Sequence, residues 1–207
     1  MKHCLLLLGM VALLAVGAPA YSQYIFMDVN GDGVCTTDDV VSNLTTSVDI
    51  YLDTNHTAAG GTVTCSDGLS ALNMFGYNVI IHAGGAGSVS YTGWTNAVAT
   101  WTVLEAYRTS GSDASVGFIA PSAASAPGKY KLGSFGISAS GAPVMSFLTS
   151  NGSLGGGAPV TGFGSDCSGT FAAFTQVLGT DFLDACGTSS GTPSNPTTWG
   201  TIKSLYR

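Results

Sequence analysis

The sequence predicts an all-β fold, an antiparallel β-sandwich of jelly-roll-like type preceded by an acidic loop. Three observations predict it. Apolar and polar residues alternate in short segments, turn residues separate these segments, and residues 47–150 lack a strong helical pattern. Closely spaced short strands are typical of sandwiches, and the 29 glycines among 207 residues suit the many turns.

The first 20 residues have the three parts of a secretory signal peptide. A basic start at Lys2 and His3 precedes an apolar run over 5–16 and a small-residue cleavage site at 18–20. A membrane anchor needs about 20 continuous apolar residues. We therefore expect residues 1–20 to be removed and the protein to be secreted or held at the cell surface. No later stretch is apolar enough to span a bilayer.

The expected strands follow in order along the chain. The first alternates cleanly, with Val48, Ile50 and Leu52 against polar neighbours, which is the period of a half-buried strand. Residues 21–27 are mostly apolar and form either a strand of the protein's own sheet or one added to a neighbour's open edge. Residues 75–82 alternate in the same way, and 88–94 alternate more weakly. The remaining strand candidates cover 97–106, 116–120, 128–138 and 144–148.

The candidate over 128–138 changes face part-way along. Tyr130 and Leu132 lie at even-numbered positions, whereas Phe135 and Ile137 lie at odd-numbered positions, so the two pairs differ in parity. The change straddles Gly133, where a β-bulge would turn the strand to its other face without ending it.

The C-terminal part is less regular. Residues 171–183 fit a helical stripe or further strands, and the sequence leaves both open. Residues 187–198 have the Gly, Ser, Thr and Pro composition of a linker. Residues 199–207 form a tail motif that either docks to a partner or surface, or packs on the sandwich as a short helix. The main domain is therefore expected over 21–186.

Four cysteines remain after signal cleavage. An even number in an exported protein indicates disulfides rather than zinc, because the C-x2-C spacing of thiolate zinc sites is absent. Four cysteines allow three pairings, and short local loops favour two bonds, Cys35–Cys65 and Cys167–Cys186.

The acidic loop over residues 28–39 has the donor spacing of a calcium site. Oxygen-bearing groups fall at loop positions 1, 3, 5, 7, 9 and 12, and Gly33 lies at position 6, where the chain must turn sharply. Calcium binds six to eight oxygens on such loops. The alternative is a metal-free Asx turn. The predicted Ca2+ ligands are Asp28, Asn30, Asp32, the Val34 carbonyl, Thr36 and Asp39.

The last ligand position favours a structural site over a switch. Asp39 is shorter than the Glu found there in regulatory EF-hands, and no pair of long amphipathic helices flanks the loop.

Two segments resemble known exported modules. The Asp28-Val-Asn-Gly-Asp-Gly33 segment, closed by Asp39, resembles one calcium loop of a type I dockerin, a family that carries two such loops. Segments 75–81 and 128–137 resemble strands of a cohesin-like sandwich. The order of loop and sandwich also resembles that of uncharacterised secreted bacterial proteins. The resemblance implies a binding or scaffolding module rather than an enzyme.

Composition and motifs exclude several functions. Six basic residues in a chain of net charge −6 cannot form a nucleic-acid-binding patch. Residues 187–191 match the G-x-S-x-G pattern, but no His follows to complete a hydrolase triad. Glu105 is the only Glu, so a glycosidase pair is poorly supported. We therefore expect no enzymatic activity.

Aromatic residues offer a candidate ligand surface. Tyr91 and Trp94 are candidates for a sugar-stacking platform, with a place in the core as the alternative for Trp94. The core is favoured for Trp101. The leading hypothesis is thus a calcium-stabilised binding or adhesion module with an extracellular protein or polysaccharide partner. The alternative is a self-assembling extracellular subunit, filament-like or surface-layer-like, whose partners are identical subunits.

Overall fold

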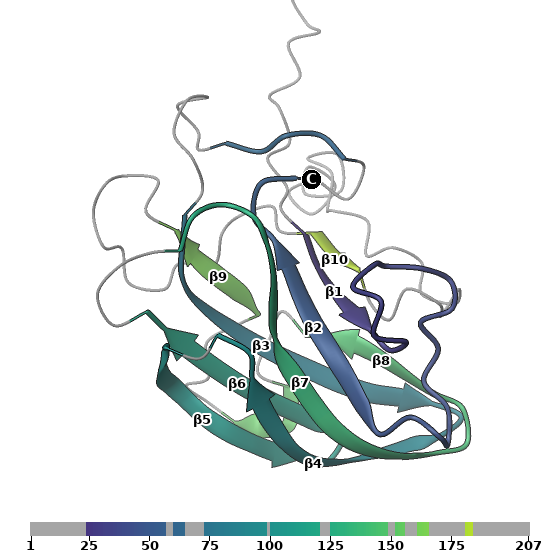
Figure 1. The fold of residues 1–207 in the computed structure, drawn as a ribbon. Helices are drawn as coiled ribbons and strands as arrows, with labels where there is room; N and C mark the ends of the chain where they lie inside the picture. The colour runs from purple at the N-terminus through teal and green to yellow at the C-terminus, as the bar shows by residue number, and fades with distance from the viewer. Residues whose placement is uncertain are drawn as a thin grey trace, which may run out of the picture.

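The protein folds as two β-sheets packed face to face (Figure 1). The computed structural model describes residues 24–56, 60–64, 73–98, 100–120, 125–148, 152–155, 161–165 and 181–183. Within these residues there are ten strands, one 3-10 turn and no α-helix. The predicted all-β sandwich with antiparallel sheets is therefore confirmed.

The first sheet contains the N-terminal strand, and the loop over residues 28–39 follows that strand. Every neighbouring pair is antiparallel except β1 and the three-residue β10, which run parallel. The strand order is β10 (Asp181–Leu183), β1 (Tyr24–Asp28), β2 (Ser47–Asp53), β7 (Lys129–Ser140) and β4 (Ser88–Asn96).

The second sheet is built on the long strand β3. β8 and β9 lie end to end along one edge of β3, because β9 pairs with its first half and β8 with its second, while β6 takes the other edge. The strands are β5 (Thr102–Ser110), β6 (Asp113–Ile119), β3 (Met74–Gly85), β8 (Pro143–Phe147) and β9 (Gly162–Ser165), with the 3-10 turn η1 at Gly152–Leu154.

The core lies between the two sheets and follows the predicted alternation. Val48, Ile50 and Leu52 of β2 are buried in it, whereas Asp49 and Tyr51 face outward. This is the pattern that a pleated strand with one buried face requires. The opposite sheet and the neighbouring strand β7 supply most of the other buried residues, including Tyr77, Val79, Ile81, Val116, Phe118, Leu132, Phe135 and Ile137.

The β-bulge predicted near Gly133 is present. Ile50 pairs with Gly133, but the next residue, Tyr51, pairs with Lys131, so Leu132 is the extra residue of β7. Both Leu132 and Phe135 consequently reach the core despite their different parity. Gly133 is required here because a Cβ at this position would lie 2.3 Å from Cζ2 of Trp94.

One predicted strand lies elsewhere. Residues 97–106 were expected to form a strand, but β5 begins at Thr102 and continues to Ser110. A turn precedes it, in which the Trp101 N–H donates a 3.1 Å hydrogen bond to the Val98 carbonyl. Trp101 is only 9% exposed, as expected for a core residue. Trp101 is therefore buried from a turn, and it does not belong to an alternating strand.

Several predicted segments fall outside the described residues. These are the signal peptide, the linker over 187–198 and the tail over 199–207. Of the segment 171–183 only Asp181–Leu183 is described, and it is a strand. From Tyr24 onward the N-terminal apolar segment is a strand of the protein's own sheet. In the described part of the chain no helix is long and apolar enough to cross a membrane.

Candidate functional site

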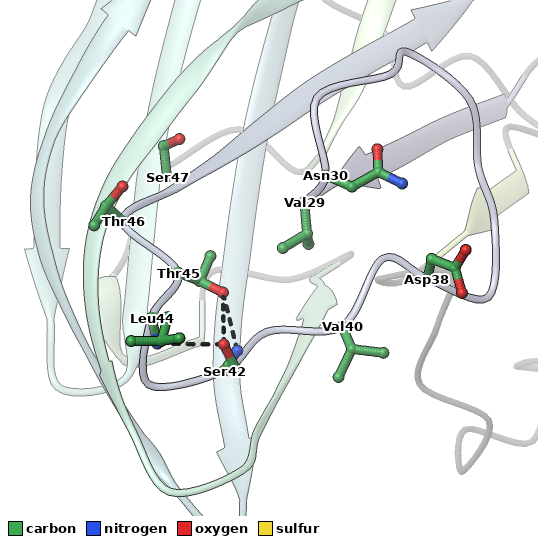
Figure 2. A pocket seen from close by; sticks show the side chains of 9 residues that line it. All are labelled: Val29, Asn30, Asp38, Val40, Ser42, Leu44, Thr45, Thr46 and Ser47. Atoms are coloured by element: carbon green, nitrogen blue, oxygen red, sulfur yellow. Dashed lines mark hydrogen bonds between the residues drawn. The ribbon is translucent and has the colours of Figure 1, made fainter.

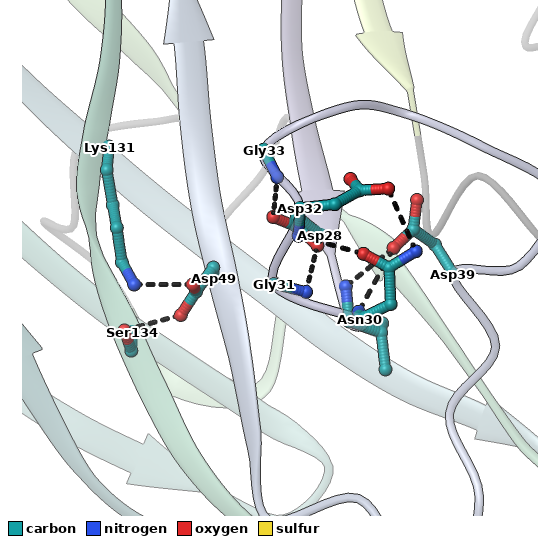
Figure 3. Close-up of polar contacts among 10 residues, drawn as sticks. Asp28, Asn30, Gly31, Asp32, Gly33, Asp39, Asp49, Lys131 and Ser134 are labelled. Carbon is teal, nitrogen blue, oxygen red and sulfur yellow. Dashed lines mark hydrogen bonds and ion pairs between the residues drawn. The ribbon is translucent and has the colours of Figure 1, made fainter.

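The loop over residues 28–39 begins at the last residue of β1 and lies beside the outer face of the first sheet (Figure 3). Its turn approaches Tyr51 of β2, since a Cβ on Gly33 would lie 3.4 Å from the Tyr51 hydroxyl. Gly31 and Gly33 have φ angles of 81° and 74°, a conformation that other residues rarely adopt. The Gly spacing in the sequence therefore sets the reversal of the chain.

Asp28 closes the first half of the loop. Its Oδ1 accepts a hydrogen bond from the Gly31 N–H and its Oδ2 one from the Gly33 N–H, both at 2.7 Å. The residue is only 1% exposed. Burial raises the pKa of Asp28, and the charges of Asp39 and Asp49 act in the same direction, while the two hydrogen bonds oppose the rise. Two other carboxylates, those of Asp39 and Asp49, therefore lie near enough to affect this buried carboxylate.

Asp39 closes the second half of the loop. It is fully buried. Its Oδ1 accepts hydrogen bonds from the N–H groups of Val29 (2.8 Å) and Asn30 (3.3 Å). Its Oδ2 accepts one from the Thr36 N–H at 2.8 Å. One carboxylate thus joins the start of the loop to its end.

Asn30 and Asp32 are exposed and form consecutive Asx turns. Asn30 Oδ1 accepts from the Asp32 N–H at 2.9 Å, and Asp32 Oδ1 accepts from the Val34 N–H at 2.7 Å. Figure 3 shows the side chains of Asp28, Asn30, Asp32 and Asp39 gathered at the same part of the loop.

The geometry is that of a loop closed by its own side chains. Among the described residues no three His, Cys, Asp or Glu side chains are grouped so that they could hold a metal. The side-chain oxygens of the loop point at its backbone N–H groups instead. A carboxylate has about four acceptor sites, so each retains acceptor capacity beyond these bonds.

Lys129 of β7 ties the loop to the sheet. Its Nζ donates a 2.8 Å hydrogen bond to the Gly33 carbonyl and lies 6.0 Å from the centre of the Tyr51 ring. Beside it, Lys131 forms an ion pair with Asp49, which also accepts a 2.6 Å hydrogen bond from Ser134. No local sequence pattern indicates the contact between Lys129 and Gly33, because the two residues lie 96 positions apart.

A pocket of about 320 Å3 adjoins the loop (Figure 2). It lies between the loop and the segment that leads into β2, and its walls combine aliphatic, hydroxyl and acidic side chains. This pocket was not predicted from the sequence, although Val40 and Leu44 are apolar residues in a polar stretch, which is a usable signal. The lining residues are Val29, Asn30, Asp38, Val40, Ser42, Leu44, Thr45, Thr46 and Ser47.

Tyr91 and Trp94 lie on β4, opposite core-facing residues of β7. The Trp94 ring lies against Gly133, 4.6 Å from the Phe135 ring. The Tyr91 hydroxyl donates a 3.0 Å hydrogen bond to the Ser112 carbonyl, and burial raises the pKa of Tyr91. Both rings are partly buried against the core, so core contacts cover much of the surface that sugar stacking needs.

The cysteines are only partly described. Cys35 is disulfide-bonded. Cys65, Cys167 and Cys186 lie outside the described residues, so the pairing proposed from the sequence stays a prediction.

Two further titratable pairs lie on the second sheet. His82 Nδ1 is 2.6 Å from Asp113 Oδ1 across β3 and β6. Glu105 forms an ion pair with Arg108 on β5, and burial raises the pKa of Glu105 against the effect of that arginine. The G-x-S-x-G segment lies outside the described residues.

No protein-family model matches the chain, and neither a curated protein nor a solved structure shows significant similarity to it.

Proposed function

We propose that this protein is an exported, non-catalytic binding module whose β-sandwich is stabilised by a calcium ion held in the loop over residues 28–39. The observation that carries the proposal is the loop itself. Its glycines and oxygen-bearing side chains occupy the positions that a calcium loop uses, and the chain reversal at Gly31 and Gly33 is already formed.

The donor set suits calcium and not a softer metal. The residues that would hold the ion are Asp28, Asn30, Asp32, the Val34 carbonyl, Thr36 and Asp39, all of them oxygen donors. Asn30 and Asp32 are exposed and need only turn from their Asx-turn bonds. The ion would supply positive charge to the buried carboxylates of Asp28 and Asp39.

Thermal unfolding of residues 21–207 with calcium and with chelator tests the proposal. A ligand at 100 times its dissociation constant stabilises a fold by about 2.7 kcal/mol, which for a domain of this size raises Tm by roughly 5–10 °C. Asp32→Ala should abolish the rise. Asp38→Ala is the matched control, because Asp38 is an exposed carboxylate of the same loop outside the ligand set.

Two results would count against calcium. One is a wild-type Tm that is the same in calcium and in chelator. The other is an equal loss of the calcium effect in both variants, which would indicate general charge attraction instead of a ligand set. The extracellular setting itself is tested by secretion of the full chain and N-terminal sequencing of the product at residue 21.

The second candidate function is self-assembly, and one observation favours it. β5 is an outer strand of the second sheet, and its Val103 and Leu104 are 54% and 44% exposed. An apolar outer strand is a ready surface for pairing with another chain. Light scattering of wild type and Val103→Lys tests this reading, because a wild type that remains monomeric at high concentration removes the reason for it.

A further inference from the structure

A disulfide enters the loop over residues 28–39 between two of its oxygen donors. Cys35 lies at position 8 of the loop, so it follows the Val34 carbonyl at position 7 and precedes Thr36 at position 9. Cys35 is disulfide-bonded, and its partner lies outside the described residues. A covalent bond therefore holds the loop at the point that separates two of the proposed calcium ligands.

Hydrogen bonds order the loop on either side of Cys35. On the N-terminal side the Val34 N–H donates to Asp32 Oδ1 at 2.7 Å. On the C-terminal side the Thr36 N–H donates to Asp39 Oδ2 at 2.8 Å. Cys35 is thus the junction between two hydrogen-bonded halves, and the disulfide fixes where this junction lies.

The junction itself is only lightly packed. Val34 is 52% exposed, and Cys35 and Thr36 are partly exposed. By contrast, the carboxylates that close the two halves of the loop, those of Asp28 and Asp39, are buried. Burial therefore restrains these two proposed ligands, whereas the ligands beside Cys35 depend more on the disulfide for their order.

We propose that the Cys35 disulfide sets the calcium affinity of this loop, so that reduction of the bond weakens calcium binding and bound calcium protects the bond from reduction. With the bond intact, the segment that carries Val34 and Thr36 is ordered before the ion arrives. Without it, calcium binding must itself order this exposed segment, and ordering a backbone costs free energy. Because preorganisation of this kind governs affinity, we expect reduction to weaken calcium binding about ten-fold.

Reduction changes the order of the loop and leaves the ligand set as it is. Calcium prefers oxygen ligands, so the thiols that reduction releases neither replace nor add a ligand. The reductant is a dithiol, whose thiolate attacks the protein disulfide and whose second sulfur then completes the exchange. One S–S bond breaks in the protein, one forms in the oxidised dithiol, and the two protons of the dithiol pass to the released thiols.

Thermodynamic linkage makes the effect reciprocal. If reduction lowers the calcium affinity about ten-fold, saturating calcium raises the ratio of reduced to oxidised dithiol that is needed for half-reduction by the same factor. For a two-electron couple, a ten-fold change corresponds to about 30 mV, toward a more negative potential of the Cys35 bond. The loop would therefore retain calcium under oxidising conditions and release it under reducing ones.

This inference deepens the proposed function and rests on it, because it concerns regulation of the same calcium loop. Redox equilibration of residues 21–207 in mixtures of reduced and oxidised dithiothreitol tests it. Samples in chelator, and in calcium chloride at a concentration that saturates both forms, are trapped by alkylation and digested. Mass spectrometry then measures the reduced fraction of the peptide that contains Cys35. We expect calcium to raise the dithiothreitol ratio at half-reduction about ten-fold.

Two variants of the loop form a matched pair. Asp32→Ala removes a proposed ligand and should abolish the calcium effect on the half-reduction ratio. Asp38→Ala removes an exposed carboxylate outside the ligand set and should retain the effect. A calcium effect of equal size in wild type and Asp32→Ala would overturn the proposal, and so would a wild-type ratio that is the same in calcium and in chelator.

Cys35→Ser measures the same coupling without a reductant, and so covers the case in which the fully reduced protein unfolds. Calorimetric titration should show calcium binding about ten-fold weaker than in oxidised wild type, with the fold checked by circular dichroism. Thr37→Ser, at an exposed position of the same loop outside the ligand set, should leave the affinity unchanged. Equal calcium affinities in folded Cys35→Ser and wild type would contradict the coupling.

The calcium-dependent Tm rise of the oxidised protein separates this proposal from the broader one. A retained Tm rise with no change in the half-reduction ratio contradicts the coupling alone. Absence of both effects contradicts the calcium loop itself, and the coupling with it.

Discussion

Lys129 Nζ donates a hydrogen bond to the Gly33 carbonyl, so a strand in the middle of the first sheet holds the turn of the loop over 28–39. The contact places a cation beside a group of carboxylates. It should therefore stabilise the loop without calcium and would oppose binding of the proposed calcium ion.

Replacing this lysine separates the two effects. Lys129→Met keeps the aliphatic stem beside Tyr51 but removes the charged donor. We expect the free energy of unfolding in chelator to fall by about 1 kcal/mol. We expect calcium to bind about two- to five-fold more tightly, because a nearby positive charge is gone. Urea unfolding and calorimetric titration measure the two quantities, and a weaker calcium affinity would contradict this account.

Gly133 should tolerate no side chain. A Cβ there would lie 2.3 Å from Trp94 Cζ2 and 2.4 Å from the Thr95 carbonyl oxygen. Gly133→Ala should therefore lower the free energy of unfolding by about 1–3 kcal/mol, the usual cost of overpacking.

The control for Gly133 is a glycine just before the same strand. A Cβ on Gly128 would meet nothing closer than 3.8 Å, so Gly128→Ala should change stability by less than about 1 kcal/mol. Equal losses in the two variants, measured by urea unfolding, would show that the contact with Trp94 does not set the cost.

Asp113 should make the fold sensitive to acid. Burial raises the pKa of Asp113, but hydrogen bonds from Ser153 and the neighbouring His82 outweigh it, so the pKa lies below its usual value of 3.8. The folded state then keeps the carboxylate charged to lower pH than the unfolded state does. This stabilisation is present above about pH 4 and is lost as the pH falls through the folded pKa.

Replacing Asp113 should change how the stability of the fold depends on pH under acidic conditions. Asp113→Asn should lower stability at pH 6 and flatten the decline of the urea midpoint between pH 4 and pH 2. His82→Gln removes only one of the stabilising partners, so it should move the decline to higher pH without flattening it. A variant profile parallel to that of wild type would contradict this role.

Tyr77 joins the two sheets through its hydroxyl. The group lies 2.8 Å from Asn96 Oδ1, to which it donates, and 3.2 Å from the Leu132 carbonyl oxygen. Tyr77→Phe leaves both acceptors without this donor, so we expect a loss of about 1–2 kcal/mol. Burial raises the pKa of Tyr77 strongly, and it raises that of Tyr91 as well, so spectroscopic titration should find at least one tyrosine that does not ionise before the protein unfolds in alkali.

Strand β2 was predictable from the sequence because one of its faces is buried and the other is largely exposed. Val48, Ile50 and Leu52 carry that signal directly. The bulge at Gly133 was predictable for the same reason, since two buried residues on opposite parities require an inserted residue.

Other features left no local signal. β10 is three residues long, too short to show a period, and its pairing with β1 depends on chain topology. Val98 is partly buried and Trp101 is buried, and both lie in a turn, which local alternation cannot distinguish from a strand. The residues that line the pocket all lie within 29–47. The pocket nevertheless depends on how the loop over 28–39 folds back beside residues 40–47, which composition does not encode.

The pairing of β2 with β7 also has a consequence for folding kinetics. Asp49 and Ser134 are 85 positions apart and lie 2.6 Å from each other through their side chains. Long sequence separations between paired strands slow folding, and sandwiches of this kind fold in about milliseconds to seconds. We therefore expect the loop over 28–39, although it is synthesised early, to reach its final shape only after β7 has joined the sheet. In a refolding experiment, high-affinity calcium uptake should coincide with the phase that docks β7.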